Sequence, residues 1–410
     1  MAASCARAAA SAAASAPWRA STARAGSLRR AGTARPAVTP PLPRRRLGDA
    51  PQSRIDAAAT PAVDVKPNFS YHVAASFIAK DRFYDPATHV FHFNPYNRIQ
   101  PPRHRRRSSR PDSGHDAFFV SRVNDSGAVA LGIADGVGGW IDSGVNPADF
   151  SHGLCDHMAA VAYEHDPAAS TTLTACGLMQ RGYDALCRQG SVHAGSSTAC
   201  VAIAAPDGIL DVANLGDSGF LHLRLNAVNA YSEPQTHDFN SPYQLAILPR
   251  LIARMAAFGG TNFCDSPRDA DVTHHRVRHG DVLIVATDGV LDNLFNQDIL
   301  RITSRVMVSS GAWTMTPSGD LGAADYIDAL VSPARPEAGE RAVTLQSLLA
   351  TELVTAAKMA SIDTRVKGPF AKQFRRYYPY EERWQGGKVD DICVVATVVC
   401  EVSAGPRSKL

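Results

Sequence analysis

Apolar residues in this 410-residue chain occur at two kinds of spacing, and each spacing predicts a different structural element. Short continuous runs predict buried strands at 116–123 and 128–134, and the Asn-Asp-Ser-Gly between them predicts a hairpin. Further runs lie within 210–223, 282–294 and 388–399. The globular body is expected to begin near residue 69.

Apolar residues spaced three and four apart predict helices at 145–165, 171–189 and 345–361. Asn146 can cap the first of these helices, and Pro147 suits its first turn. The predicted apolar face of that helix consists of Phe150, Leu154, Met158 and Val161. Because hairpins dominate, we expect largely antiparallel sheets with helices outside them.

Two stretches of the chain allow less direct interpretations. His152, Asp156 and His157 lie on the helix predicted at 145–165, where they form either its solvent-facing side or a metal site. We favour the solvent-facing interpretation. Residues 308–343 are rich in Gly, Pro, Ala and Ser, which predicts an insertion loop.

Acidic residues mark the ends of four predicted strands. Asp135 follows the run 128–134, Asp288 ends the β-branched run that begins at residue 282, and Asp390 precedes the last run. Asp217 lies in a Gly-Asp-Ser-Gly sequence that predicts a hairpin turn between two strands. A single Asp-Gly pair is an ordinary turn. Four acidic strand ends instead indicate carboxylates gathered at one rim of a sheet, where they would suit a hard cation.

The composition is that of a globular protein, with 45% hydrophobic and 20% charged residues. The formal net charge is +3, but residues 1–48 hold nine arginines and no acidic residue, so the rest of the chain is acidic. An acidic body without a pattern of stacking aromatic residues argues against nucleic-acid binding. The eight cysteines form no C-x-x-C pair, which indicates a reducing compartment. No apolar run is long enough to predict a transmembrane segment.

The ends of the chain resemble targeting signals. Residues 1–60 are rich in Ala, Ser, Arg and Pro, as in a disordered mitochondrial or plastid presequence; an untargeted tail is the alternative. The basic run 103–110 is interpreted as a solvated loop, and less readily as a region that attracts phosphorylated substrates.

The tail 403–410 closes with a three-residue peroxisomal address, formed by Ser408, Lys409 and Leu410. We therefore predict dual localisation to the mitochondrial matrix and the peroxisome. The predicted partners are the mitochondrial import machinery and the peroxisomal import receptor.

Six short motifs occur in an order that resembles the PPM, or type 2C, family of metal-dependent protein serine/threonine phosphatases. These motifs are GHDAFF, IADGVGGW, GSSTA, NLGDSG, ATDGVLDNL and GGKVDDICVV. Two others, THDFNSPYQL and GPFAKQF, resemble the branch that contains mitochondrial phosphatases of fungi, plants and animals. The resemblance covers roughly residues 69–402, so it extends over the whole predicted body.

This resemblance implies an α/β (α+β) four-layer sandwich, in which two central antiparallel β-sheets are flanked by helices on both outer faces. It also implies two Mg²⁺ or Mn²⁺ ions and phosphorylated proteins as substrates. A metal-activated water would attack the phosphorus atom in line, without a covalent enzyme intermediate. The C-x5-R signature of cysteine phosphatases is absent from the sequence, which is consistent with this route.

The family pattern assigns roles to individual residues of this chain. Asp135 would bridge the two ions, the Gly136 carbonyl would bind one of them, and Asp288 and Asp390 would hold the other. Asp116 occupies the acidic position on the first strand of this pattern. The resemblance further implies a third, weaker ion position at Asp217 and Asp292, and Arg110 is the nearest candidate for the phosphate-binding arginine.

One departure from the family pattern leaves two functional classes open. His115-Asp116 stands where many relatives have two carboxylates, and a neutral imidazole can accept only one hydrogen bond. Metal affinity would then fall, or the pH dependence would steepen near neutrality. We favour an active phosphatase over a pseudophosphatase that serves as a binding module. A two-metal nucleic-acid enzyme is disfavoured by the acidic body.

Overall fold

The computed structural model describes six segments of the chain, which are residues 68–93, 110–166, 172–249, 264–332, 343–380 and 384–402. The predicted presequence 1–60, the tail with Ser408, Lys409 and Leu410, and all of the basic run except Arg110 lie outside the described residues. No described helix is long and apolar enough to cross a membrane.

The first of two large sheets has six strands in the order β2-β1-β17-β14-β8-β9, and all neighbours are antiparallel. Their bounds are β1 Phe69–Ile78, β2 Val90–His92, β8 Gly219–Arg224, β9 Ala227–Tyr231, β14 Val282–Ala286 and β17 Ile392–Glu401. The second strand in chain order is thus at one edge, and the last strand lies at the centre between β1 and β14.

The other large sheet has five antiparallel strands in the order β13-β7-β6-β4-β3. Their bounds are β3 Asp116–Arg122, β4 Val129–Asp135, β6 Ala199–Ala204, β7 Ile209–Leu215 and β13 Asp271–Arg276. Smaller pairs are formed by β5 Gly195–Ser197 with β12 Leu245–Ile247, β10 Thr236–Asp238 with β11 Ser241–Pro242, and β15 Trp313–Met315 with β16 Leu321–Ala323.

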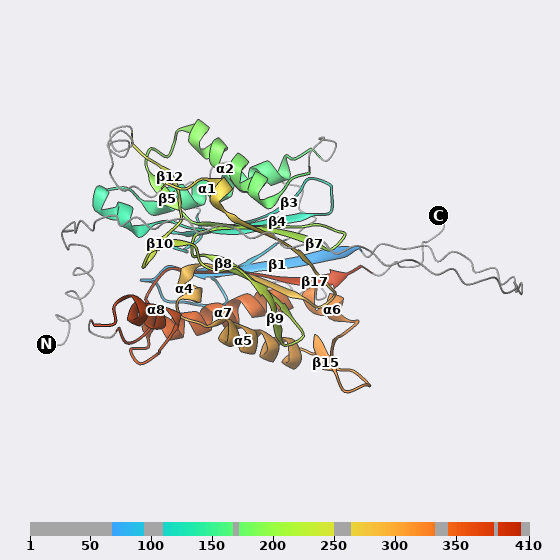
Figure 1. The fold of residues 1–410 in the computed structure, drawn as a ribbon. Coiled ribbons are helices and arrows are strands. Elements are labelled where there is room, and N and C mark those ends of the chain that lie inside the picture. Colours follow the sequence, from blue (N-terminus) through green and yellow to red (C-terminus); the bar gives the residue numbers. More distant parts are fainter. Residues whose placement is uncertain are drawn as a thin grey trace, which may run out of the picture. The chain divides into compact units, whose positions relative to one another are not determined.

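Helices cover the outer face of each sheet, which gives the predicted four layers (Figure 1). Helices α1 (Pro147–Tyr163) and α2 (Ala175–Gln189) belong to the five-stranded side. The six-stranded side carries α4 Asp288–Leu291, α5 Asn296–Ser309, α6 Ile327–Val331, α7 Leu345–Ile362 and α8 Pro369–Tyr377. The predicted sandwich of two antiparallel sheets flanked by helices is therefore confirmed.

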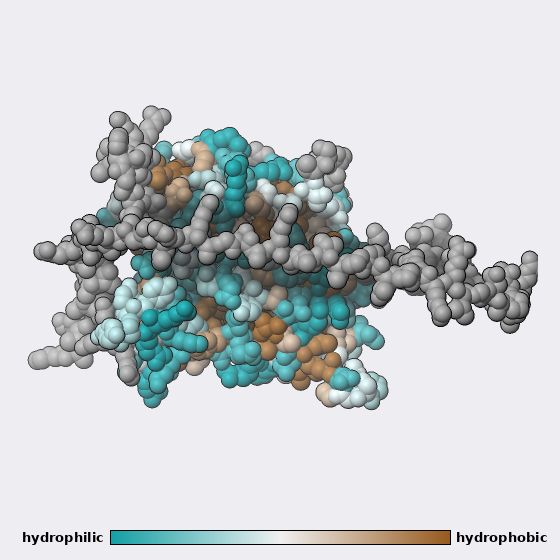
Figure 2. Space-filling view, in the orientation of Figure 1, coloured by the Kyte–Doolittle hydropathy of each residue, from teal (hydrophilic) through white to brown (hydrophobic). Residues whose placement is uncertain are grey.

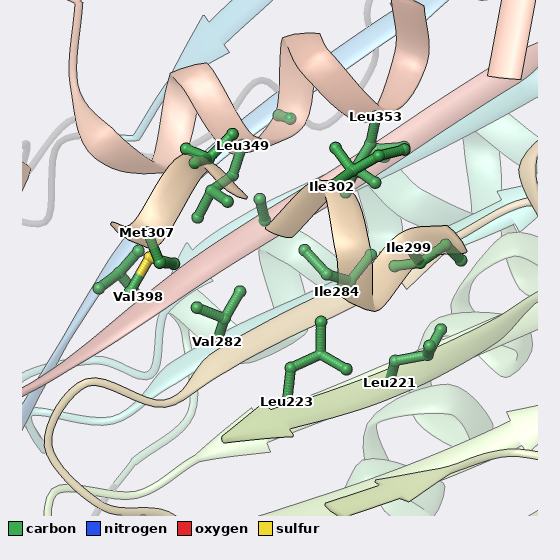
Figure 3. Packing of buried hydrophobic residues seen from close by; sticks show 14 of the residues in the cluster. Leu221, Leu223, Val282, Ile284, Ile299, Ile302, Met307, Leu349, Leu353 and Val398 are labelled. Atoms are coloured by element: carbon green, nitrogen blue, oxygen red, sulfur yellow. The ribbon is translucent and has the colours of Figure 1, made fainter. Parts of the chain in front are cut away.

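Burial on both faces explains why the strands have continuous apolar runs rather than alternating ones. In β17, Val394 and Val398 pack under α5 and α7, whereas Val395 and Val399 face the other sheet. Figure 3 shows the outer cluster, in which Leu349 and Leu353 of α7 lie over the sheet. Fully burying one such side chain contributes roughly 1.5–3 kcal/mol, so these layers supply much of the stability.

Most predicted helices agree with the observed ones. The helix expected at 145–165 is α1, and the Asn146 side chain caps it by accepting a hydrogen bond from the Ala148 N–H at 3.1 Å. The helices expected at 171–189 and 345–361 correspond to α2 and α7. Thr174 caps α2, and Thr344 caps α7.

The hairpin predicted around Asp217 is wrong. Strand β7 pairs within the five-stranded sheet and β8 within the six-stranded sheet, so residues 216–218 cross from one sheet to the other. Gly216 has a φ of +105°, and a Cβ there would lie 2.7 Å from the Tyr243 carbonyl oxygen. The turn residues were correctly recognised, but they say nothing about which partner each strand pairs with.

Two other expectations also need correction. His152 is buried at 5% exposure and is therefore not on the solvent-facing side of α1. Within the described residues, His152, Asp156 and His157 do not form a group of metal ligands. The predicted insertion loop 308–343 contains the β15–β16 hairpin and α6, and its Trp313 is fully buried with its N–H donating to the Gly280 carbonyl at 2.9 Å.

The described surface in Figure 2 is mostly hydrophilic, with hydrophobic residues in patches between the charged ones. Several large apolar side chains are exposed, among them Met315 and Met359 at 67% each. Isolated exposed apolar residues are normal in soluble domains.

Candidate metal centre

The predicted acidic strand ends come together at one rim of the sandwich. The antiparallel register of β3 and β4 places Asp116 directly opposite Asp135. The other two come from the six-stranded sheet, in which β14 and β17 are neighbours. Asp288 follows β14, and Asp390 precedes β17. The four carboxylates lie close enough to perturb one another electrostatically. The prediction of one acidic rim is thus supported, with contributions from both sheets.

Hydroxyl groups of two other motifs hold the backbone of this rim. Thr198 accepts a hydrogen bond from the Asp135 N–H at 3.1 Å, and its own N–H donates to the Asp135 carbonyl at 3.0 Å. The Thr198 hydroxyl also lies 2.8 Å from that of Ser218. The crossover 216–218 is therefore tied, through Ser218, to the strand end that carries Asp135.

The turn at Asp288 is shaped by close backbone packing. Thr287 begins α4, and its hydroxyl donates to Asp116 at 2.8 Å while accepting from the Cys393 N–H at 3.0 Å. A Cβ on Gly289 would lie 1.9 Å from the Asp391 carbonyl oxygen, so only glycine fits beside Asp288. The Asp-Gly pair is required here by packing as well as by the turn.

Three carboxylates of the rim have a buried oxygen that receives no hydrogen bond from the described residues. These oxygens are Oδ1 of Asp116, Oδ1 of Asp217 and Oδ1 of Asp288. Burying an acceptor without a donor costs about 1–3 kcal/mol, and more when the group is charged. Unsatisfied carboxylate oxygens are the ligands that Mg²⁺ and Mn²⁺ prefer, so the site fits such a cation.

The pKa values of the rim carboxylates report the same accumulation of negative charge. Burial raises the pKa of Asp135 well above its ordinary value, and the charges of Asp288 and Asp116 raise it further. Burial and Asp288 likewise raise the pKa of Asp217. Burial also raises the pKa of Asp292 to about 6, although Lys388 opposes this effect. Bound cations would reverse these shifts by favouring the ionised carboxylates.

The carboxylates are not packed as tightly as the ligands of one small ion. Among the described residues, the only three ligating groups within 4.8 Å of one another are His72, Asp328 and Cys400, which are not part of this rim. The wider spacing at the rim suits ions that keep several waters, as Mg²⁺ does.

Lys388 is a member of the site that sequence reasoning missed. Its ammonium group contacts Asp288, lies 2.7 Å from Asp292 and 3.2 Å from Asp390. Burial alone would lower the pKa of Lys388, but these three carboxylates raise it well above its ordinary value. The only signal in the sequence was a lysine two residues before Asp390, which no general rule connects with a metal site.

The neighbour of His115 is Asp391, another residue without an assigned role in the sequence-based prediction. Asp391 is 4% exposed and accepts hydrogen bonds from the Lys80 N–H at 2.7 Å and the His115 N–H at 2.8 Å. The His115 ring nitrogen Nδ1 lies 3.6 Å from the same carboxylate. His115, which departs from the family pattern, therefore adjoins the carboxylate of Asp391 just before the start of β17.

Arg110 is held at the first turn of α1. Its guanidinium group donates to Asp149 at 2.8 Å, and both side chains are largely buried. A cavity of about 360 Å³ also borders the rim, where Asp217 and Asp292 share its lining with Phe220, Leu294 and Phe370 and with polar residues such as Gln373. A cavity with both apolar and polar walls thus adjoins two of the rim carboxylates.

Comparisons with known proteins agree with this geometry. The family model "Protein phosphatase 2C" matches residues 103–317. The chain is 33% identical to the 5-azacytidine resistance protein azr1 of Schizosaccharomyces pombe over 70% of its length and 83% of that protein. It is 33% identical to the protein phosphatase PTC7 homolog fig of Drosophila yakuba over 74% of its length and 81% of that protein.

Two further similarities extend the comparison. The chain is 33% identical to the mitochondrial protein phosphatase 2C homolog 7 of Saccharomyces cerevisiae, over 56% of its length and 64% of that protein. The structure of the photosystem II phosphatase PBCP matches with a TM-score of 0.50 at 24% identity, covering 71% of this chain and 92% of that one. The chain belongs to the PPM (type 2C) family of Mg²⁺- or Mn²⁺-dependent protein serine/threonine phosphatases.

Proposed function

We propose that this protein hydrolyses phosphoserine and phosphothreonine in proteins at a centre of two Mg²⁺ or Mn²⁺ ions. The observation that carries the proposal is the group of unsatisfied, buried carboxylate oxygens on Asp116, Asp217 and Asp288 at one rim. When bound, such ions lower the pKa of a water molecule and neutralise charge on the phosphoryl group. The reaction then needs no nucleophilic side chain.

The proposed roles of the residues follow from their places in the fold. Asp135 and the Gly136 carbonyl would hold ions from the five-stranded sheet, and Asp288 and Asp390 from the six-stranded sheet. Asp116 is fixed by Thr287 at 2.8 Å and would orient water beside the ions. Arg110 would bind the substrate phosphate only after its ion pair with Asp149 opens.

The test is hydrolysis of a phosphoserine peptide by the purified chain with Mg²⁺, with Mn²⁺ and with a chelator. We expect turnover with either ion and none after chelation. For Asp→Asn variants of the rim, Asp320→Asn serves as a matched control that should keep wild-type turnover, because Asp320 is exposed in the turn between β15 and β16. Peptide binding without hydrolysis at saturating Mn²⁺ would instead support the pseudophosphatase alternative.

We further propose that the chain is imported into the mitochondrial matrix and, through Ser408, Lys409 and Leu410, into peroxisomes. The support is the arginine-rich, acid-free segment 1–48, the C-terminal tripeptide and the name of the yeast relative. A fluorescent tag in the exposed turn at Ser318 leaves both termini free. Deleting 408–410 should abolish only the peroxisomal signal, and an unchanged distribution would refute dual targeting.

A further inference from the structure

We propose that Lys388 is a tethered cation that takes the place of a third metal ion, so that the centre holds two divalent ions and no more. This inference rests on the proposed two-ion function. It concerns the position at Asp217 and Asp292, where the family resemblance implied a further, weaker ion. The structure places a positive charge of the chain itself 2.7 Å from Asp292, one of the two carboxylates at that position.

The contacts of the Lys388 ammonium group define its place. It contacts the carboxylate of Asp288, which is a proposed ligand, and lies 2.7 Å from Asp292 and 3.2 Å from Asp390. The side chain is only 13% exposed. A buried charge is stable only when it is paired, and three carboxylates pair this one. Lys388 therefore occupies Asp292, one of the two carboxylates that a third ion would need, and also pairs with Asp288 and Asp390 at the edge of the two-ion centre.

The backbone of Lys388 is fixed by a single buried amide. The Asn293 side chain accepts a hydrogen bond from the Lys388 N–H and donates one to its carbonyl, each at 2.9 Å. The same amide group donates to the Gly289 carbonyl at 2.9 Å, which ties the arrangement to α4. Asn293 is 3% exposed, so water does not compete for these bonds. The lysine is thus held beside Asp288 by the turn that carries Asp288.

An aromatic ring completes the surroundings of the ammonium group. The Phe370 ring centroid of α8 lies 5.3 Å from the Lys388 Nζ, within the range of a cation–π interaction. The same ring lines the cavity beside Asp292. The third-ion position is consequently bounded by an apolar ring, which is a poor neighbour for a hydrated divalent ion and an acceptable one for an ammonium group.

The balance of charge leads to the same conclusion. The carboxylates of the rim are Asp116, Asp135, Asp217, Asp288, Asp292 and Asp390. Two divalent ions and one ammonium group nearly neutralise this set. A third divalent ion would have to bind Asp292 while Lys388 remains 2.7 Å from it, and the two cations would repel each other.

The experiment counts Mn²⁺ ions bound to the full chain by isothermal titration calorimetry after chelation, and it measures the thermal midpoint in chelator at pH 8. We expect two Mn²⁺ per wild-type chain. Lys388→Met should bind a third ion, and its midpoint in chelator should be lower by about 5 °C or more, because three carboxylates lose their partner. Adding Asp292→Asn to Lys388→Met should restore a count of two.

Two further variants separate charge from packing. Lys388→Arg keeps the charge and should keep the count at two. Lys372→Met is the matched control, since Lys372 on α8 also lies over a ring, that of Phe295 at 5.9 Å, but is exposed. It should change neither the count nor the midpoint.

Three ions in the wild type would overturn the inference without any variant being needed. A count of two in Lys388→Met, with its midpoint unchanged, would also overturn it. If Lys388 instead served mainly to bind substrate, Lys388→Met would raise the KM for a phosphopeptide and leave the ion count at two. A wild-type chain that binds no Mn²⁺ would refute the proposed function itself, which is a different result from a count of three.

Discussion

The two ends of strand β14 carry buried aspartates with opposite properties. Asp281 precedes the strand and is 1% exposed; it accepts hydrogen bonds from Arg224 at 2.7 and 2.8 Å, from His222 at 2.7 Å and from the Arg278 N–H at 2.7 Å. Asp288 follows the strand and is 7% exposed, and one of its oxygens has no donor among the described residues. Both aspartates are buried, but their partners are very different.

The pKa values separate Asp281 from the carboxylates of the rim. Burial acts to raise the pKa of Asp281, but the hydrogen bonds and charges of Arg224 and His222 lower it below its ordinary value. At the rim, burial and neighbouring carboxylates raise the pKa values of Asp116 and Asp135. A satisfied carboxylate stabilises the fold, whereas an unsatisfied one in a group of like charges indicates a ligand-binding site.

The largest expected effect is on catalysis at the Asp288 end. Asp288→Asn should lower turnover by at least about 10²-fold at saturating Mn²⁺, because the substitution removes a charged ion ligand. The same loss is expected for Asp135→Asn and Asp390→Asn. The measurement is the turnover rate on a phosphoserine peptide, and normal turnover in Asp135→Asn would contradict the assignment of the rim.

At the opposite end, the expected effect is on folding. Asp281→Asn should lower the free energy of unfolding by about 3 kcal/mol, since it leaves Arg224 and His222 without their charged partner. Turnover per folded molecule should stay within about two-fold of wild type. Urea unfolding and an activity assay on the same sample check both statements. A large loss of turnover without loss of stability would show that Asp281, like Asp288, acts in catalysis and not in folding.

The two ends should also respond differently to pH in the metal-free protein. Raised pKa values mean that the folded rim binds more protons than the unfolded chain, so stability falls as pH rises through the folded-state pKa values. Metal-free protein should therefore become more stable between pH 8 and pH 5, a range that includes the value of about 6 for Asp292.

Asp281 has the opposite sign, because its lowered pKa contributes stability that is lost only as pH falls below its ordinary range. Thermal midpoints in chelator from pH 8 to pH 3 test both ends together. The Asp281→Asn variant should keep the gain between pH 8 and pH 5. A midpoint that falls steadily from pH 8 downward would show that the rim carboxylates are not mutually destabilising.

The smallest expected effect concerns His115. His115→Glu should lower the half-saturating Mg²⁺ concentration by a few fold, because it adds a carboxylate near the proposed ions. The nearby Asp391, 3.6 Å from the His115 ring, limits the gain, since the new charge would lie next to it. A metal titration of activity at fixed pH measures this. An unchanged or raised half-saturating Mg²⁺ concentration would mean that Asp391 already supplies the negative charge needed near the ions.

Several parts of the site could be predicted because their signals are local. Asp135, Asp288 and Asp390 each follow or precede an apolar run, and a strand end is readable from a few residues. The capped helix α1 was equally accessible through Asn146 and Pro147. Family resemblance then supplied roles for these carboxylates that periodicity alone does not contain.

Other parts depended on contacts between distant residues. The pairing of Lys388 with Asp288 spans 100 positions, and that of His115 with Asp391 spans 276. The burial of His152 likewise depends on what packs against α1 in the folded chain, and no feature of its own helix reveals it.

The sequence by itself determined three of the helices and several central strands, where the acidic residues fall along the strands, and the family to which the chain belongs. Only the tertiary structure decided that β7 and β8 join different sheets, that both oxygens of Asp281 are satisfied while one oxygen of Asp288 is not, and that a lysine lies among the rim carboxylates. The physical reason is that spacing and turn chemistry act over a few residues. Burial and charge pairing are set instead by what the folded chain brings into contact.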